Sequence, residues 1–320
     1  MRFEDVLDRS QRSGLSHMEA AELLGISERT FRRWRDRHRE FGLQGLADGR
    51  LGPSPRRASV SEIERMLGLY RDLYRGFTVK HFHEQLLKRH NYGLGYTVTK
   101  LHLHRAGLVQ PAKKRSAHRK KRPRRPMVGM LLHQDASTHA WLPGDERKYD
   151  LVVTMEDATS ALYSAFLVGE EGTASSFQGL REVVDKHGLF CSLYSDRGSH
   201  YFFTPEAGGK VSKTVLTQVG RALSQLGIDH IAAYSPQARG RSERVFLTLQ
   251  DRLTKEFKLA GIDSVEAANT WLRDSFIADY NARFAIQAEQ TGSAFVVDRT
   301  GHGGRSCVCR RIARWAKTTR

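Results

Sequence analysis

The chain has 320 residues, enough for two or three domains with separate cores, and 39% of them are hydrophobic without any apolar run long enough to span a membrane. Three cysteines are too few for a disulfide framework or a four-ligand zinc site, and the first residues lack the apolar core of a secretory signal, so we expect a protein inside the cell. The formal charge of +17 is concentrated in residues 1–126, whose net charge is +16, whereas residues 127–298 have a net charge of −6; this distribution favours a nucleic-acid-binding arm joined to a different kind of domain.

Residues 1–50 are predicted to form a helix-turn-helix DNA-binding domain. Between residues 16 and 40 the chain reads as helix, tight turn and helix, because Gly25 suits the turn and Ser27 is a good N-cap for the second helix. The second helix has one apolar side and a basic face suited to a DNA major groove. The side chains predicted to contact DNA there are Arg29, Arg32, Arg33, Arg35 and Arg37. The alternative is an ordinary basic helical hairpin.

Residues 51–110 are predicted to form a second helical DNA-binding domain, either a helix-turn-helix or a winged-helix-like fold. An amphipathic stretch runs to His90, a turn follows at Asn91, and a helix is expected from about Thr97 to Arg105. Four histidines raise the alternative of a metal site: His81, His83, His102 and His104. Their i, i+2 spacing points the side chains about 200° apart on a helix, which disfavours shared ligation of one ion.

Residues 111–126 contain nine Lys and Arg residues and no acid, and are predicted to form a basic linker. A run of like charge repels itself and is typical of a solvated tether, but between two DNA-facing domains it also suits contact with a phosphate backbone. The linker residues predicted to bind DNA are Lys113, Lys114, Arg115, Arg119, Lys120, Lys121 and Arg122.

Residues 127–298 change to an alternating, β-branched pattern. Strands are expected over 130–141, 149–157, 161–168, 189–194 and 228–234, and helices over 173–187, 214–226 and 241–259. Three consecutive strands followed by alternating helices and strands is the order of the ribonuclease H-like fold. The predicted fold class is therefore an α/β ribonuclease H-like core, a mixed five-stranded sheet with flanking helices, preceded by all-α helix-turn-helix DNA-binding domains.

Three carboxylates stand at ends or borders of the expected elements in this core. Asp135 lies within the first strand, Asp196 follows the fourth strand, and Glu243 projects from the border of the apolar stripe of the last helix. We expect neighbouring strands to bring Asp135 and Asp196 together, and the docked helix to turn Glu243 toward them. Such a set of oxygen ligands suits two Mg²⁺ ions, which activate a water or a 3′-hydroxyl for displacement at a phosphodiester.

The motifs around these acids carry a family resemblance. They are His-Gln-Asp-Ala-Ser at 133–137, Ser-Asp-Arg-Gly-Ser-His-Tyr at 195–201 and Ser-Pro-Gln-Ala-Arg-Gly-Arg-Ser-Glu-Arg at 235–244. With the preceding helix-turn-helix, the chain resembles insertion-sequence transposases with a DDE, integrase-like core, and is most similar to the ISNCY group. The resemblance implies that Asp135, Asp196 and Glu243 are catalytic metal ligands for two Mg²⁺ ions per active site, for which Mn²⁺ substitutes.

The same resemblance implies a function. It predicts a DNA transposase that binds the terminal repeats of its insertion sequence, nicks the ends by hydrolysis and joins the 3′-hydroxyls to target DNA. It also implies double-stranded DNA as a partner, a dimer or larger homo-oligomer in the synaptic complex, and a cytoplasmic, nucleoid-associated location without membrane contact. The alternatives are a decayed transposase that acts only as a sequence-specific DNA-binding regulator, which leaves the three acids unexplained, and a ribonuclease H-like nuclease, which does not need two recognition domains.

Several residues near the acids require a separate interpretation. Asp196 and Glu243 are separated by 46 residues, more than in many integrase-like enzymes, so we expect an inserted loop at Tyr201–Ser212. Asp157, at the end of a strand, is interpreted as structural rather than as a metal ligand. The arginines that flank Glu243 are predicted to hold DNA phosphates, with ordinary surface charge as the alternative: Arg239, Arg241 and Arg244.

Residues 299–320 contain seven basic residues, no acid and no recognisable helix or strand pattern, and are predicted to form a basic tail. Transposases of the resembled type continue here into a β-rich segment. Reading the codons required for residues 315–319 one base earlier permits Val-Gly-Lys-Asp-Asn, which looks like that segment. We therefore hypothesise that a frameshift after about residue 298 produced an out-of-frame tail; the alternative is a native basic tail that binds DNA.

Overall fold

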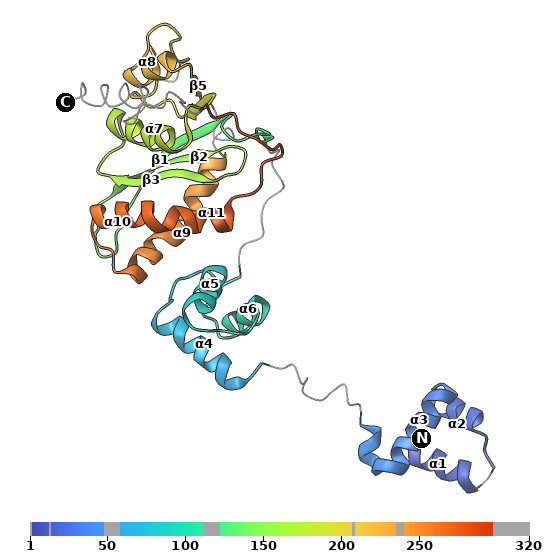
Figure 1. The fold of residues 1–320 in the computed structure, drawn as a ribbon. Coiled ribbons are helices and arrows are strands. Elements are labelled where there is room, and N and C mark those ends of the chain that lie inside the picture. The colour runs from blue at the N-terminus through green and yellow to red at the C-terminus, as the bar shows by residue number, and fades with distance from the viewer. Residues whose placement is uncertain are drawn as a thin grey trace. The chain divides into compact units, whose positions relative to one another are not determined.

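A computed structural model describes residues 2–12, 14–47, 58–111, 122–206, 209–234 and 240–296 (Figure 1). The chain divides into two compact units, Met1–Arg65 and Met66–Arg320. The predicted tail at 299–320 and residues 112–121 of the predicted linker lie outside the described residues. In the described part of the chain, no helix is both long and apolar enough to cross a membrane.

The first unit contains the predicted helix-turn-helix. Its elements are α1 (Phe3–Arg12), α2 (His17–Leu23), α3 (Glu28–Phe41) and the 3₁₀ turn η1 (Gly42–Leu46). Ser16 and Glu19 form a capping box at the start of α2, and the Ser27 side chain caps α3 by accepting a hydrogen bond of 3.2 Å from the backbone of Thr30. Gly25 has a φ of 65° between the two helices, a conformation that glycine adopts without strain. The helix-turn-helix prediction is confirmed, and α1 contributes to its core.

Residues 58–111 form the helices α4 (Val60–Asp72), α5 (Val79–Arg89) and α6 (Tyr96–Arg105). All of these residues are described and none is in a strand, so they contain no strand-built wing. Two of the histidines contact backbone carbonyls: His83 Nε2 lies 3.1 Å from the oxygen of Leu94, and His104 Nδ1 lies 2.8 Å from that of Val109. These two rings are therefore engaged by the backbone.

The predicted mixed sheet is confirmed, with the strand order β3-β2-β1-β4-β5. The strands are β1 (Leu132–His139), β2 (Tyr149–Glu156), β3 (Leu162–Val168), β4 (Ser192–Ser195) and β5 (Asp229–Ala232). The first three strands pair antiparallel, whereas β4 pairs in parallel with both β1 and β5. This is the arrangement of the ribonuclease H-like fold, and it places the end of β4 beside the first half of β1.

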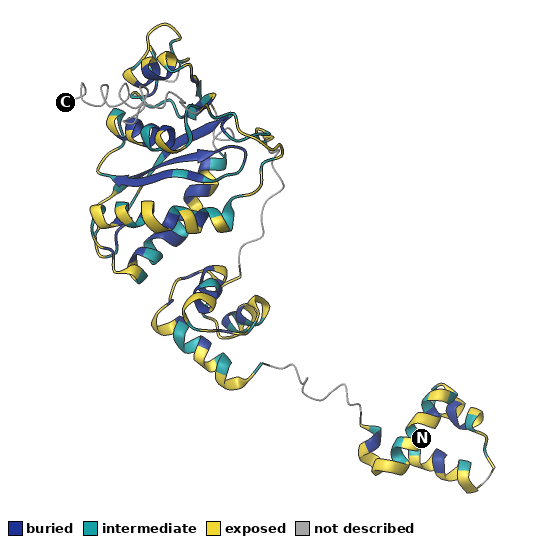
Figure 2. Cartoon of the chain, in the orientation of Figure 1, coloured by how far each residue is buried: buried dark blue, intermediate teal, exposed yellow. Residues whose placement is uncertain are grey.

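Helices cover both faces of the sheet, and Figure 1 shows α7 on one side and α9 to α11 on the other. The first layer contains α7 (Thr173–His187) and α8 (Gln218–Gln225), whose apolar side chains pack with Leu132 and Leu193. The second contains α9 (Gly240–Ala260), α10 (Val265–Trp271), the π-helical turn η4 (Leu272–Phe276) and α11 (Ile277–Phe284), which pack on Leu151 and Val153. Figure 2 shows the central strands almost entirely buried between these layers.

The observed elements depart from the sequence prediction in several places, including α1, which was not predicted, and β4, which begins at Ser192 and not at residue 189. The helix expected from residue 214 begins at Gln218, because the Thr217 side chain caps it by accepting a hydrogen bond of 3.1 Å from Gly220. The helices between residues 265 and 284 were not predicted from the sequence. The expected inserted loop is consistent with the structure, since the described residues 201–206 and 209–217 contain neither helix nor strand.

Candidate active site

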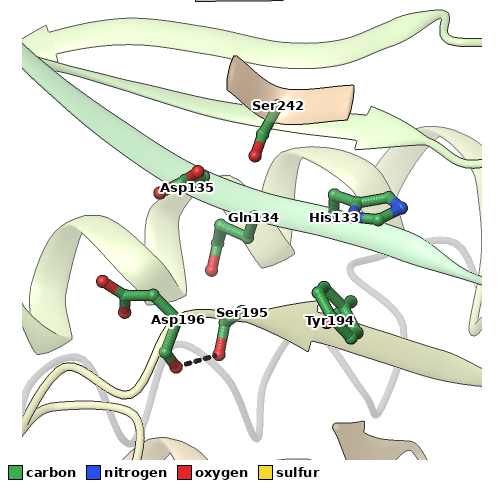
Figure 3. Close-up of a pocket in the computed structure, with 7 residues that line it drawn as sticks. All are labelled: His133, Gln134, Asp135, Tyr194, Ser195, Asp196 and Ser242. Carbon is green, nitrogen blue, oxygen red and sulfur yellow. Dashed lines mark hydrogen bonds between the residues drawn. The ribbon is translucent and has the colours of Figure 1, made fainter. Parts of the chain in front are cut away.

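Asp135 and Asp196 lie in one pocket, as the sequence predicted from their strands. The pairing of β1 with β4 places His133 opposite Tyr194. Both aspartates lie two residues further along these parallel strands, so they stand at the same level of the sheet. Figure 3 shows Asp135 on β1, Asp196 beyond the end of β4, and Ser242 of α9 directed toward them. The pocket is lined by His133, Gln134, Asp135, Tyr194, Ser195, Asp196 and Ser242.

Short backbone contacts orient both carboxylates. Oδ1 of Asp135, which is only 7% exposed, accepts a hydrogen bond of 3.1 Å from the backbone of Ala136. Oδ1 of Asp196 accepts one of 2.9 Å from the backbone of Gly198. Since a Cβ at Gly198 would come within 3.1 Å of that same oxygen, the glycine leaves room for the carboxylate as well as orienting it.

Glu243, which was expected to turn toward the two aspartates, is not among the residues that line this pocket. It is exposed in the first turn of α9, whereas its neighbour Ser242 is 4% exposed and faces the aspartates. Within the described ranges, no group of three His, Cys, Asp or Glu side chains is close enough to hold a metal ion. The paired aspartates nevertheless match the preference of Mg²⁺, which is commonly bound by one or two carboxylates together with waters and substrate phosphates. The donor chemistry therefore fits a divalent cation between Asp135 and Asp196.

A buried amide on the opposite face of β1 supports the first aspartate. Gln134 donates from Nε2 to Oγ1 of Thr154 at 3.0 Å and to the backbone oxygen of Ser176 at 3.2 Å. Its Oε1 accepts a hydrogen bond of 2.9 Å from the hydroxyl of Tyr201. Burial raises the pKa of Tyr201 well above its ordinary value, so the phenol remains a donor. Gln134 therefore ties β1 to β2, to α7 and to the segment that follows Asp196.

A serine and a histidine hold the end of β4 next to the second aspartate. Oγ of Ser195 lies 2.9 Å from Nε2 of His230 and donates a 3.1 Å hydrogen bond to the backbone oxygen of Asp196. The His230 ring stacks on Phe202, with 4.0 Å between the ring centroids. Burial lowers the pKa of His230 to about 4, so the ring is neutral at pH 7 and positions Ser195 without adding charge beside Asp196.

The arginines predicted to contact DNA in α3 differ in their surroundings. Arg32 pairs with Glu28, Arg35 pairs with Asp36, and Arg37 donates to the backbone oxygen of Ala47. Arg29 and Arg33 are exposed, and among the described residues neither makes an ion pair or a side-chain hydrogen bond. Of the five arginines predicted to contact DNA in α3, these two have the side chains most accessible to a ligand.

The remaining predicted DNA contacts are spread over described and undescribed parts of the chain. Arg244 is exposed on α9, whereas Arg122 and Arg241 both pair with the buried carboxylate of Asp157. The residues that lie outside the described ranges are Lys113, Lys114, Arg115, Arg119, Lys120, Lys121 and Arg239.

Comparison with known proteins identifies relatives for most of the chain. Residues 1–47 match a family of homeodomain-like domains. The chain is 31% identical over 283 residues to "Putative transposase y4bF" of Sinorhizobium fredii, an alignment that covers 88% of this chain and 61% of that protein. It is 26% identical over 297 residues to the transposase for insertion sequence IS1202 of Streptococcus pneumoniae, with coverage of 82% and 63%. The chain thus spans less than two thirds of the length of these relatives.

Solved integrase structures also show similarity to the chain. A cryo-EM structure of the simian T-cell lymphotropic virus intasome with a PP2A regulatory subunit is 18% identical, with a TM-score of 0.39 and coverage of 58% of this chain and 63% of that chain. The HTLV-2 integrase catalytic core domain in complex with magnesium is 15% identical, with a TM-score of 0.34 and coverage of 46% and 85%.

Proposed function

We propose that the chain is an insertion-sequence transposase that binds the terminal repeats of its own element, nicks the ends by metal-dependent hydrolysis and joins the 3′-hydroxyls to target DNA. The observation that carries this proposal is the placement of Asp135 and Asp196 at one level of two parallel strands, in a single pocket. Two carboxylates are costly to place together unless a cation neutralises them. A polyanionic substrate would otherwise be repelled from this pocket.

The roles of the acids follow from their positions. Asp135 and Asp196 hold the metal from the sheet, and Glu243 completes the set from the first turn of α9. Two Mg²⁺ ions are proposed per active site, with Mn²⁺ as a substitute. When bound, such ions activate the attacking hydroxyl and stabilise the leaving oxygen of the phosphodiester. The protein contributes rigid placement: Gly198 orients the carboxylate of Asp196, and Gln134 ties the strand of Asp135 to β2.

DNA recognition is assigned to the helical part of the chain. Helix α3, with Arg29 and Arg33 exposed, is proposed to enter the major groove of the terminal repeat. The basic run at 111–126 is proposed to follow phosphates between recognition and catalysis. Since two element ends are joined in one event, the active complex is proposed to contain at least two copies of the chain.

A strand-joining assay tests this function. The full chain is incubated with the DNA ends that flank its gene, target DNA and Mg²⁺, and Asp196→Asn serves as the matched control. We expect joined product from the wild type, and bound but unjoined DNA from the variant. DNA that is bound but neither nicked nor joined by the wild type would contradict the proposal and favour a DNA-binding regulator. Nicking without joining would instead favour a nuclease.

A further inference from the structure

The carboxylate of Asp157, which directly follows β2, accepts hydrogen bonds from side chains of three separate segments. It is fully buried, and its Oδ1 accepts hydrogen bonds from His133 of β1 at 2.7 Å, from Arg122 of the linker end and from Arg241 of α9. Its Oδ2 accepts a hydrogen bond of 2.7 Å from the backbone of Arg125. An ionised carboxylate offers about four acceptor positions. Three donors converge on Oδ1 and one on Oδ2, so both oxygens are engaged by the protein, which supports the interpretation that Asp157 is not a metal ligand.

The cluster extends beyond the carboxylate. Arg241 also donates from Nη2 to the backbone oxygen of Arg122 at 2.8 Å, and Arg124 donates from Nη1 to the backbone oxygen of Asp157 at 2.9 Å. Burial alone would raise the pKa of Asp157, but the hydrogen bonds from His133, Arg125 and Arg241 outweigh it and hold the pKa far below its ordinary range. Asp157 is therefore ionised at any physiological pH, and these contacts persist.

Arg241 links this cluster to the active site, because it lies two residues before Glu243 on the same helix. Side chains two apart on a helix point about 200° apart. Arg241 and Glu243 therefore stand on opposite borders of the buried stripe of α9, with the buried Ser242 between them. Anchoring Arg241 on Asp157 fixes the rotation of the first turn about the helix axis. That rotation decides how near the carboxylate of Glu243 comes to Asp135 and Asp196.

We propose that Asp157 is a positioning residue, which sets the placement of Glu243 by clamping Arg241 against the turn after β2 and the end of the linker. This inference rests on the proposed function, because it assigns Glu243 to the metal-binding set. It adds a residue that touches neither metal nor DNA. It also connects the linker, through Arg122, to the same carboxylate that holds the helix of Glu243.

The test uses the full chain with Asp157→Asn, Arg241→Gln and Arg241→Lys, and with Lys258→Gln as a matched control. Lys258 is exposed on the same helix, far from the clamp, and its replacement also removes one positive charge. The first measurement is amide hydrogen exchange in residues 240–247. We expect exchange at least about tenfold faster in Asp157→Asn and Arg241→Gln, and no change in Lys258→Gln.

The second measurement is Mn²⁺ binding by calorimetry, which does not depend on DNA. Loss of a residue that orients a metal ligand typically weakens metal binding about 10–100-fold, and we expect that loss in Asp157→Asn and Arg241→Gln. Arg241→Lys should restore most of the affinity, because it keeps an ion pair with Asp157. If Asp157 served the fold alone, all three variants would have a lower melting temperature, and Arg241→Lys would not restore Mn²⁺ affinity.

The outcomes for the clamp and for the proposed function are distinguishable. Unchanged exchange and unchanged Mn²⁺ affinity in both Asp157→Asn and Arg241→Gln would overturn the clamp, even if the wild type joins DNA ends. Weakened Mn²⁺ binding and a loosened first turn would support the clamp, even if the wild type fails to join DNA. Should Asp157→Asn fail to fold, Arg241→Gln decides the question, because the Arg241 side chain is partly exposed and less costly to replace.

Discussion

Nε2 of His81, in α5, lies 2.7 Å from Oε1 of Glu256, in α9, and this contact joins the helical segment to a helix that covers the sheet. Gln85 donates to the same oxygen at 2.8 Å. Burial would raise the pKa of Glu256, but the hydrogen bond from His81 and the charges of His81, Arg283 and Arg89 lower it below its ordinary value. The folded protein therefore favours the ionised form of Glu256.

Replacing this carboxylate should change how stability depends on pH. A carboxyl group with a lowered pKa stabilises the fold at pH values above its ordinary pKa, and that contribution is lost as the pH falls through the lowered value. Glu256→Gln should therefore lower stability by about 1–3 kcal/mol at pH 7, where a hydrogen bond to a charged group is lost. The difference from wild type should narrow below about pH 4. Calorimetric melting from pH 7 to pH 3 measures both effects, and Asp274→Asn, an exposed acid, is the control.

Adding one methyl group beside Asp196 should reduce activity with little loss of stability. A Cβ at Gly198 would stand 3.1 Å from Oδ1 of Asp196 and 2.9 Å from Cε1 of His200. The backbone φ of Gly198 is not in the left-handed region, so alanine can adopt it. Displacement of a catalytic group by a fraction of an ångström costs about 10–100-fold in rate. Strand joining by Gly198→Ala should fall by that factor, whereas Gly169→Ala, whose Cβ would meet nothing within 4 Å, should match the wild type. Equal rates for the two variants would show that this carboxylate tolerates displacement.

Of the arginines on α3, Arg33 should contribute strongly to sequence recognition. It is exposed and makes no ion pair within the described helix-turn-helix, so its guanidinium is available to a base edge or a phosphate. Arg33→Ala should weaken binding to the terminal repeat by about 1–3 kcal/mol if it contacts a base. The control is Arg12→Ala, which removes one exposed charge from α1. A fluorescence titration at several salt concentrations distinguishes a base contact from a phosphate contact. Loss of a phosphate contact lowers the slope of log affinity against log salt concentration by about one.

The strands could be predicted from short-range patterns, and the meeting of two of the three acids could be predicted from the strand order that those patterns imply. Alternating and apolar runs predicted the five strands, and the sheet order expected of the ribonuclease H-like fold predicted that Asp135 and Asp196 would meet. The helices after residue 264 were missed, although a signal was present. Ser264 caps α10 by accepting a hydrogen bond of 3.3 Å from Ala267, and Glu266 lies in the first turn.

The contacts around the acids could not be predicted, because they join segments that are far apart in the sequence. Gln134 and Tyr201 are 67 residues apart, and Arg241 and Asp157 are 84 apart. Neither pair lies in a pattern that local periodicity reveals. Sequence reasoning also treated Arg241 as a DNA contact, whereas the fold engages it with Asp157. The DNA role of Arg241 stays a prediction.

Replacing the third acid should reduce activity without reducing stability, because Glu243 is exposed in the first turn of α9. Exposed substitutions away from special features usually change stability by less than about 0.5 kcal/mol. Glu243→Gln should therefore keep the wild-type melting temperature and lose about 10²–10³-fold in strand joining, the usual cost of removing one catalytic electrostatic group. Glu266→Gln makes the same change at an exposed first-turn position of α10 and should retain full activity. Full activity in Glu243→Gln would mean that the metal is held by Asp135 and Asp196 without it, and the clamp on α9 would then serve the fold alone.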